Sequence, residues 1–201
     1  MLMDHLGYKK YNLRGGSYGT RIARVVADYF PDRINAAIYD SPAPHRNDYL
    51  LTRMEDYSAA LIKVFAYNED RYPSLESDYL RMLNGLDKKA LEAEYNGRPF
   101  HLNAQDAIFF LRYQLYNNAS RDLVPDFIYA ILKKDMPIVN QFIRGRASSS
   151  SNFAMFLACE NYEEYDQSIT DEVVRKKYNT LPLLPYDLPI FTSIYLSLEN
   201  I

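Results

Sequence analysis

The order of hydrophobic and polar residues near the amino terminus predicts a strand, a helix and a second strand. Alternation over residues 8–14 indicates a short strand. Hydrophobic residues then recur at helical spacing between 22 and 29, and Pro31 ends this pattern because proline cannot continue a helix. Residues 34–39 are largely apolar, which is typical of a buried parallel strand. Two strands joined through a helix in this way lie parallel in one sheet.

Beyond Pro42 the hydrophobic spacing becomes helical for about a hundred residues, which predicts an inserted helical region. Asn103 is expected to be the N-cap of one of its helices, with Asp106 at the third helical position. A run of serines at 147–152 is the best candidate for a linker, and a predicted strand follows it at 153–159. Helices are expected over 1–6 (closed by Gly7), 47–67, 74–83, 103–116, 121–133, 136–144 and 171–178.

Composition narrows the class of protein without identifying it. The chain has 201 residues, 48% of them hydrophobic and 24% charged, so it can bury a globular core. Its net charge of -3 provides no broad basic surface and argues against nucleic-acid binding. Cys159 is the only cysteine, and no Cys/His cluster has the spacing of a metal site, so no metal or cofactor is expected. The sequence contains no signal peptide or membrane-spanning stretch, so the chain as written is expected to be untargeted; this absence would suit the cytoplasm, but the compartment itself is left open.

The first candidate for chemistry is Ser17, within the run Gly-Gly-Ser-Tyr-Gly-Thr at 15–20. The pattern G-x-S-x-G falls between a predicted strand and a predicted helix, where a sharp turn lifts a nucleophilic serine above the sheet edge. Its glycines are expected to remove Cβ atoms that would collide in that turn. The backbone N–H of Tyr18 would then help to stabilise an oxyanion. The alternative is a glycine-rich turn that cradles phosphate, with Ser17 as a helix N-cap.

These residues resemble a segment of a known enzyme family called the nucleophile elbow, the sharp turn between a strand and a helix that carries the catalytic serine. The segment 6–21, the Phe-Pro-Asp-Arg of 30–33 and the Tyr-Asp-Ser of 39–41 are similar to α/β-hydrolase serine peptidases. Within that group they resemble the proline iminopeptidases and the tripeptidyl-aminopeptidase-like (TAP-like) enzymes. The resemblance implies the fold class α/β, with a partial α/β-hydrolase sheet (strand, elbow, helix, strand) and a large inserted helical lid.

The same resemblance divides the chain and implies a catalytic triad. It assigns residues 1–44 to the hydrolase core, 45–152 to the helical lid and 153–201 to a segment that returns toward the core. In such enzymes an aspartate and a histidine follow the serine, and neither family pattern occurs after Cys159. A serine without a base is a weak nucleophile. The chain is therefore expected to be a fragment of a longer hydrolase that is inactive by itself.

Three histidines and one aspartate are the remaining candidates for the triad. His5, His45 and His101 are expected to be surface or packing residues. Asp40 ends the strand after the elbow, where some α/β-hydrolases place their catalytic acid. Its expected role is to brace the turn before Pro42, with catalysis as the alternative.

Glu160 is the candidate for substrate binding. Enzymes that recognise a free peptide amino terminus need a carboxylate to pair with the ammonium, and the resemblance of Cys159-Glu160 to the family's Cys-Glu implies this role. The alternative is a solvated acid within the charged run 160–166. Aromatic residues of the predicted lid are expected mainly to pack between helices, and those that face the elbow would contact an apolar substrate.

Three functions stay open on the basis of sequence. The first is a serine aminopeptidase that uses Ser17, the Tyr18 amide and Glu160. The second is an esterase or lipase-like hydrolase of the same fold, in which Glu160 is incidental. The third is a non-catalytic remnant or binding module. The expected partners are a peptide or small-molecule substrate and other copies of the chain, which would associate through exposed sheet edges.

Overall fold

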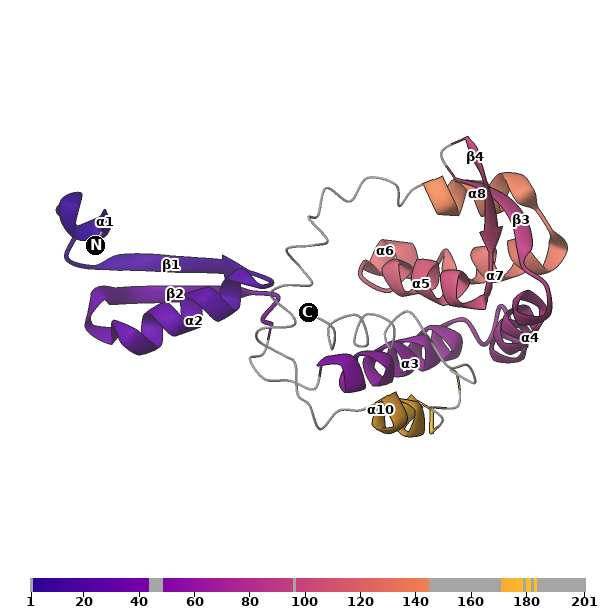
Figure 1. The fold of residues 1–201 in the computed structure, drawn as a ribbon, viewed down its shortest axis with the longest axis horizontal. Helices are drawn as coiled ribbons and strands as arrows, with labels where there is room; N and C mark the ends of the chain where they lie inside the picture. Colours follow the sequence, from indigo (N-terminus) through magenta and orange to yellow (C-terminus); the bar gives the residue numbers. More distant parts are fainter. Residues whose placement is uncertain are drawn as a thin grey trace. The chain divides into compact units, whose positions relative to one another are not determined.

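The computed structural model divides the chain into two compact units, residues 1–47 and 48–201, each of which is described by itself (Figure 1). The residues that it describes are 2–43, 49–95, 97–144, 171–178, 180, 181 and 183. They form helices and two small sheets of two strands each. None of the helices among them is long and apolar enough to cross a membrane.

The first unit contains two parallel strands and a helix that packs against both of them (Figure 1). The strands pair from Tyr11 opposite Ile34 to Gly16 opposite Asp40. This confirms the predicted strand, helix and strand, although the first strand begins and ends later than the predicted 8–14. The elements are α1 (Leu2–His5), β1 (Tyr11–Gly16), α2 (Gly19–Tyr29), the 3-10 turn η1 (Pro31–Arg33) and β2 (Ile34–Asp40).

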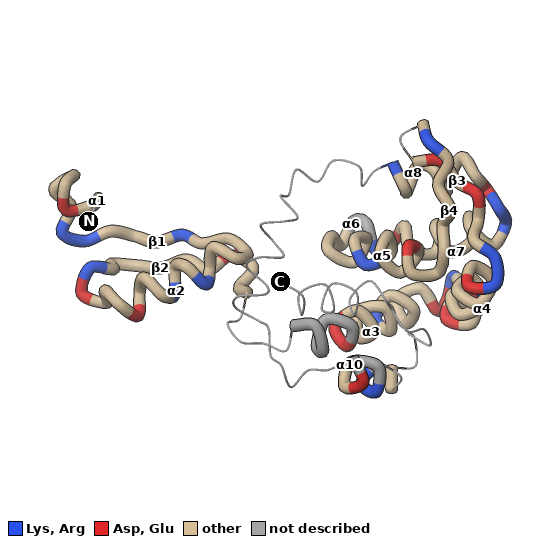
Figure 2. The backbone as a smooth tube through the Cα atoms, viewed as in Figure 1, with Lys and Arg blue, Asp and Glu red and all other residues tan. Residues whose placement is uncertain are grey.

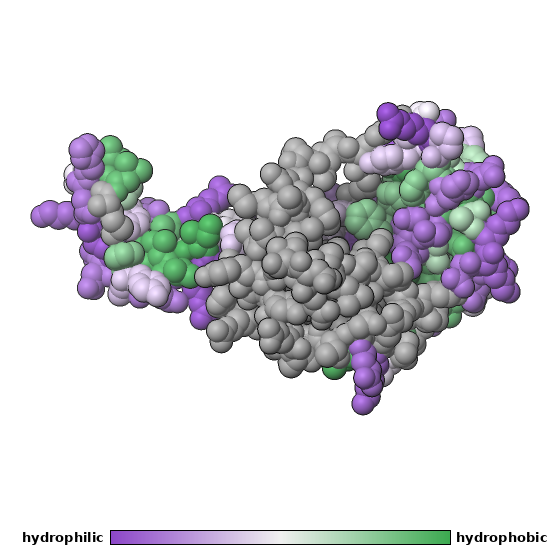
Figure 3. Space-filling model, viewed as in Figure 1, coloured by the Kyte–Doolittle hydropathy of each residue, from purple (hydrophilic) through white to green (hydrophobic). Residues whose placement is uncertain are grey.

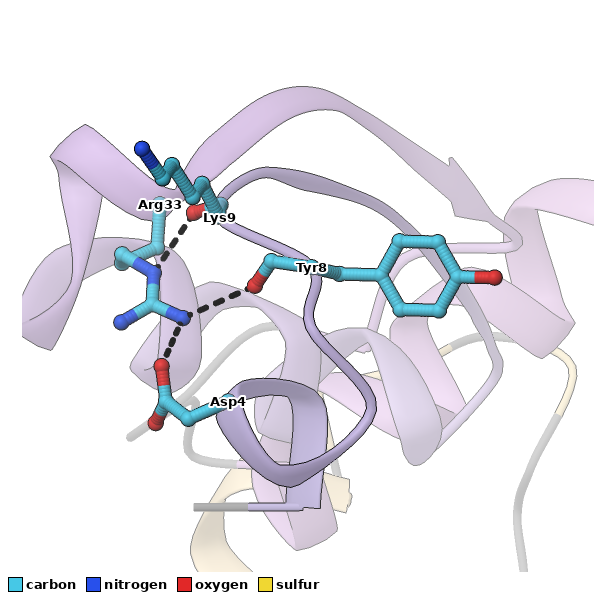
Figure 4. Close-up of polar contacts among 4 residues, drawn as sticks. All are labelled: Asp4, Tyr8, Lys9 and Arg33. Atoms are coloured by element: carbon cyan, nitrogen blue, oxygen red, sulfur yellow. Dashed lines mark hydrogen bonds and ion pairs between the residues drawn. The ribbon is translucent and has the colours of Figure 1, made fainter.

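Arg33 connects α1 to the start of the sheet. Because β2 begins at Ile34, the residues before Tyr11 have no strand beside them. The Arg33 guanidinium donates instead to the backbone oxygens of Tyr8 at 3.1 Å and Lys9 at 2.7 Å, and it also pairs with the Asp4 carboxylate (Figure 4). The hydrogen bond from Arg33 holds the pKa of Asp4 below its ordinary value.

Gly7 ends α1, as the sequence predicts. Its φ is +81°, in the region that favours glycine. The N–H groups of Gly7 and Tyr8 donate to the backbone oxygens of Asp4 and Met3 at 3.0 and 2.9 Å. The last turn of this short helix is therefore closed by its own backbone.

Small side chains bring α2 close to the sheet. Its buried residues are Thr20 and Ala23, while Ile22, Val25 and Tyr29 are 56%, 50% and 77% exposed. The predicted helix is confirmed, but most of its bulky hydrophobic residues do not face the strands. A hydrophobic patch accordingly lies over β2 and α2 on the visible face of this unit (Figure 3).

The second unit has a continuous hydrophobic core between its helices. Leu61, Tyr79, Leu111 and Phe127 are all fully buried. The Tyr79 hydroxyl also donates to the backbone oxygen of Leu183 at 3.1 Å, which holds a late part of the chain against this core. The elements are α3 (Tyr49–Tyr67), α4 (Leu75–Lys88), β3 (Leu91–Tyr95), β4 (Arg98–Leu102), α5 (Ala104–Gln114), α6 (Asn118–Arg121), α7 (Val124–Lys133), α8 (Met136–Arg144) and α10 (Asp171–Tyr178).

The helices predicted for this unit are present, with some ends shifted. Asn103 caps α5 as predicted: its side chain accepts from the Asp106 N–H at 3.0 Å, and the Asp106 carboxylate accepts from the Asn103 N–H at 3.1 Å. The helix expected over 171–178 is α10, which lies against α3. The linker at 147–152 and the strand at 153–159 lie outside the described residues. The assignment of 45–152 as a lid stays a prediction.

One correction concerns residues 91–102, which are not part of an all-helical insertion. Here β3 and β4 form an antiparallel hairpin. Its first strand alternates Leu91, Ala93 and Tyr95 with glutamates, and its turn has the sequence Asn-Gly, with Gly97 at a φ of +74°. Alternation around Asn-Gly is a strong local hairpin signal, which the helical spacing on both sides concealed.

Acidification is expected to release α1 from the first unit. Because the pKa of Asp4 is lowered in the folded unit, its contribution to stability is present above its ordinary value of 3.8 and is lost as the pH falls below it. We expect the Gly7 and Tyr8 amides to lose protection from hydrogen exchange in this range, as measured by NMR.

Two variants test this assignment. Asp4→Asn should remove the pH dependence of this protection, whereas Asp32→Asn, at a nearby exposed acid in η1, should retain it. Equal pH dependence in the wild type and in Asp4→Asn would show that the contact with Arg33 does not hold α1.

Candidate functional site

Ser17 lies at the apex of the turn between β1 and α2. It is exposed, and its φ of +50° is a left-handed conformation that residues other than glycine rarely adopt. Its N–H donates to the backbone oxygen of Asp40 at 2.9 Å, which continues the pairing with β2. Tyr18 is already helical, with φ of -53° and ψ of -34°. The change from strand to helix is therefore made at Ser17.

Gly15 allows this turn to be tight. A Cβ atom at position 15 would lie 2.3 Å from the backbone oxygen of Gly19 and 2.8 Å from the backbone nitrogen of Thr20. Gly16 and Gly19 have open space at the same position, and neither has a positive φ. The expectation that the glycines of this run prevent Cβ collisions is therefore confirmed for Gly15 and is wrong for the other two.

Thr20 fixes the position of the Ser17 backbone. It is 3% exposed, its hydroxyl donates to the backbone oxygen of Ser17 at 2.7 Å, and the same hydroxyl accepts from the Ala43 N–H at 2.9 Å. One side chain thus joins the elbow to the chain that leaves β2. Sequence reasoning missed this residue, although a threonine three positions after the nucleophile is a known signal for a hydrogen bond back to the main chain.

The carboxyl ends of both strands meet beside Ser17. Ser41 directly follows β2 and also has a left-handed φ, of +54°. The Asp40 carboxylate lies 3.5 Å from the Arg14 guanidinium and accepts from the Ser41 hydroxyl at 3.3 Å. These contacts agree with the expected bracing role, although the exposed ion pair is a weak one. They do not test the alternative of a catalytic acid. Ligands of parallel α/β sheets bind at this edge.

This geometry suits nucleophilic attack on a carbonyl. The serine hydroxyl is exposed at the sheet edge, and α2 begins directly after it, so the positive end of the helix dipole lies where negative charge would develop. The N-cap of α2 is Tyr18, and no side chain caps the helix. A side-chain cap from Ser17 is therefore absent, and the alternative of a turn that cradles phosphate stays a prediction.

The described residues of the first unit provide no histidine at the elbow. His5 lies in α1, beyond the opposite end of β1 (Figure 1). The six residues of β1 span about 20 Å, which is too far for proton transfer to Ser17. His101 is exposed on β4 of the second unit. His45 and Glu160 lie outside the described residues. Among those described, no group of three or more His, Cys, Asp or Glu side chains could hold a metal ion.

Comparison with known proteins adds one finding. Residues 1–99 match a family model described as the alpha/beta hydrolase fold. The matched range contains β1, Ser17, α2 and β2. No curated protein and no solved structure matches the chain. The match supports the α/β-hydrolase fold over this range and a hydrolase in general.

Replacing Gly15 with alanine is expected to open the elbow. The new methyl group would overlap the Gly19 carbonyl, so β1 and α2 must separate, at a cost of at least about 1–3 kcal/mol. Gly16→Ala is the matched control because its Cβ meets no atom within 4 Å. Hydrogen exchange of the β1 and α2 amides in the whole chain measures the effect. Similar protection in the two variants would show that the close approach at Gly15 is not required.

Thr20 is expected to stabilise the elbow through its hydroxyl group. Thr20→Val keeps the shape of the side chain but removes the bonds to Ser17 and Ala43, which should cost about 1–3 kcal/mol. Thr20→Ser keeps the hydroxyl and should retain most of this stability. Thermal unfolding followed together with exchange of the Ala43 amide measures both variants. A loss in Thr20→Ser without a loss in Thr20→Val would assign the role of Thr20 to its methyl group.

Proposed function

We propose that the protein is a serine hydrolase that uses Ser17 as its nucleophile and forms an acyl-enzyme. The observation that carries the proposal is the exposed serine held at a left-handed φ between a parallel strand and a helix. The match of residues 1–99 to the alpha/beta hydrolase fold supports it independently. Strained residues that are held by their surroundings cluster at active sites.

In this proposal the described residues have distinct tasks. The Ser17 Oγ attacks the substrate carbonyl, and the Tyr18 backbone N–H helps to bind the oxyanion at the start of α2. Gly15 and Thr20 act as positioning residues that hold the serine backbone. A histidine general base would lie outside residues 2–43, because His5, the one histidine among them, is too far from Ser17.

The substrate class separates two forms of the proposal. In the aminopeptidase form, Glu160 pairs with the ammonium group at the end of a peptide. In the esterase form, the substrate has no such group and Glu160 is incidental. The family match is compatible with both forms, so substrate preference must decide between them.

The nucleophile is tested first, on the protein as its source cells produce it. A fluorophosphonate reacts with activated serines, and trypsin would release the labelled serine in the peptide 15–21, between Arg14 and Arg21. We expect the label on Ser17 and its loss in Ser17→Ala, with turnover reduced at least about a thousandfold. Ser41→Ala is the matched control, since Ser41 is also exposed at a left-handed φ at the adjacent strand end. Labelling that survives Ser17→Ala would overturn the proposal.

The substrate class is tested next, with aminoacyl amides and short-chain esters. If Glu160 binds the amine, Glu160→Gln should raise KM for the amides at least about tenfold and leave kcat and ester hydrolysis nearly unchanged. Glu163→Gln, in the same charged run, is the control. Ester hydrolysis without amide hydrolysis would support the esterase form, and equal effects of the two variants would remove Glu160 from substrate binding.

A further inference from the structure

A groove of about 510 Å³ lies within the second unit, and its lining residues all belong to that unit. It is bounded by the end of α4, the start of β3, the end of α7 and the start of α8. Its volume falls within the range of small-molecule sites, about 300–1,000 Å³. All of its lining residues belong to the described part of the chain.

The floor of the groove is apolar and adaptable. Met82, Leu86 and Ile131 are buried there, at 1%, 4% and 5% exposed. Leu132 and Met136 line it as half-buried residues. Methionine side chains are unbranched and can adjust to ligands of different length. This floor therefore suits a flexible aliphatic chain.

The rim of the groove carries an excess of positive charge. Lys and Arg positions lie along the turns beside α4, α7 and β3, with acidic positions among them (Figure 2). Arg81 is already paired with Asp78 at 2.7 Å. Lys89 and Lys134 are exposed and form no ion pair among the described residues, and Glu92 is the one carboxylate in the lining. A ligand with a single negative charge would complement this rim.

The backbone at Lys134 gives a second, independent indication. Lys134 ends α7 with φ of +57° and ψ of +38°. Glycine or asparagine adopts this left-handed conformation at a lower cost in conformational energy than lysine does. The helix dipole accounts for a positive charge near the end of α7, but it does not account for a lysine in a left-handed conformation. Strain that is kept at a side-chain-bearing residue points to a task for that side chain.

We propose that this groove binds an aliphatic carboxylate, with its chain on the methionine and leucine floor and its carboxylate beside Lys89 and Lys134. The proposal goes beyond the hydrolase activity, and it does not depend on the chemistry of Ser17. Binding involves no covalent step. The site is therefore separable from the elbow by experiment.

Titration of the whole chain with octanoate, decanoate and dodecanoate tests the ligand class. Calorimetry should show affinity that rises by up to about fourfold for each added methylene until the groove is filled. Methyl decanoate and decylamine have the same chain with a neutral and a positive head group, and both should bind at least about fivefold more weakly than decanoate. Equal affinity for the three head groups would overturn the role of the lysines. Tight binding of an acidic peptide without binding of the carboxylates would overturn the ligand class.

Lys134→Gly separates a binding role from a structural one, because the two predict opposite effects. If the lysine serves the ligand, the variant should bind decanoate about two- to fivefold more weakly, while its unfolding temperature stays unchanged or rises by up to about 3 °C. Lys89→Ala should weaken binding to a similar extent. Lys88→Ala is the control, since Lys88 is exposed on the last turn of α4 and does not line the groove. A lower unfolding temperature with unchanged affinity in Lys134→Gly would overturn the proposal.

Discussion

The candidate site depends on the approach of two backbones, at Gly15 of β1 and Gly19 of α2. A methyl group on Gly15 would lie only 2.3 Å from the Gly19 oxygen. The first turn of α2 can therefore lie in close contact with β1, and the single residue Ser17 makes the change from strand to helix. The same proximity leaves room beneath α2 for Thr20 and Ala23 but not for its larger residues.

Hydrogen bonds convert this approach into a defined position for Ser17. The Ser17 N–H bonds to Asp40, and the Ser17 oxygen accepts from both the N–H and the hydroxyl of Thr20. The Thr20 hydroxyl also accepts from Ala43. A left-handed residue other than glycine costs roughly 1–2 kcal/mol, and these bonds offset that cost. The reactive hydroxyl is thereby exposed on a backbone that is held on several sides.

The second unit positions its candidate groove by different means. Its core of helices and one hairpin is continuous, so the ends of α4 and α7 are fixed side by side. Asp78 neutralises Arg81 and also accepts from the Tyr129 hydroxyl at 2.8 Å, so the two lysines, set against the single carboxylate of Glu92, give the rim its excess positive charge. In both units the candidate residue, Ser17 or Lys134, has a left-handed backbone that glycine would adopt more readily.

The sequence by itself determined the order of the strands and helix around the elbow, most helices of the second unit and the capping box at Asn103, because periodicity, proline and cap residues act over a few positions. It also contained the Asn-Gly hairpin signal at 91–102, although the surrounding helical spacing concealed it. Only the tertiary structure decided which face of α2 packs on the sheet and that Gly15 alone is sterically required. It also decided that Lys89 and Lys134 share one groove. The packed face of α2 and the shared groove arise from contacts between residues distant in sequence, which local patterns do not encode. The requirement at Gly15 depends on how closely α2 approaches β1, which the G-x-S-x-G pattern does not specify.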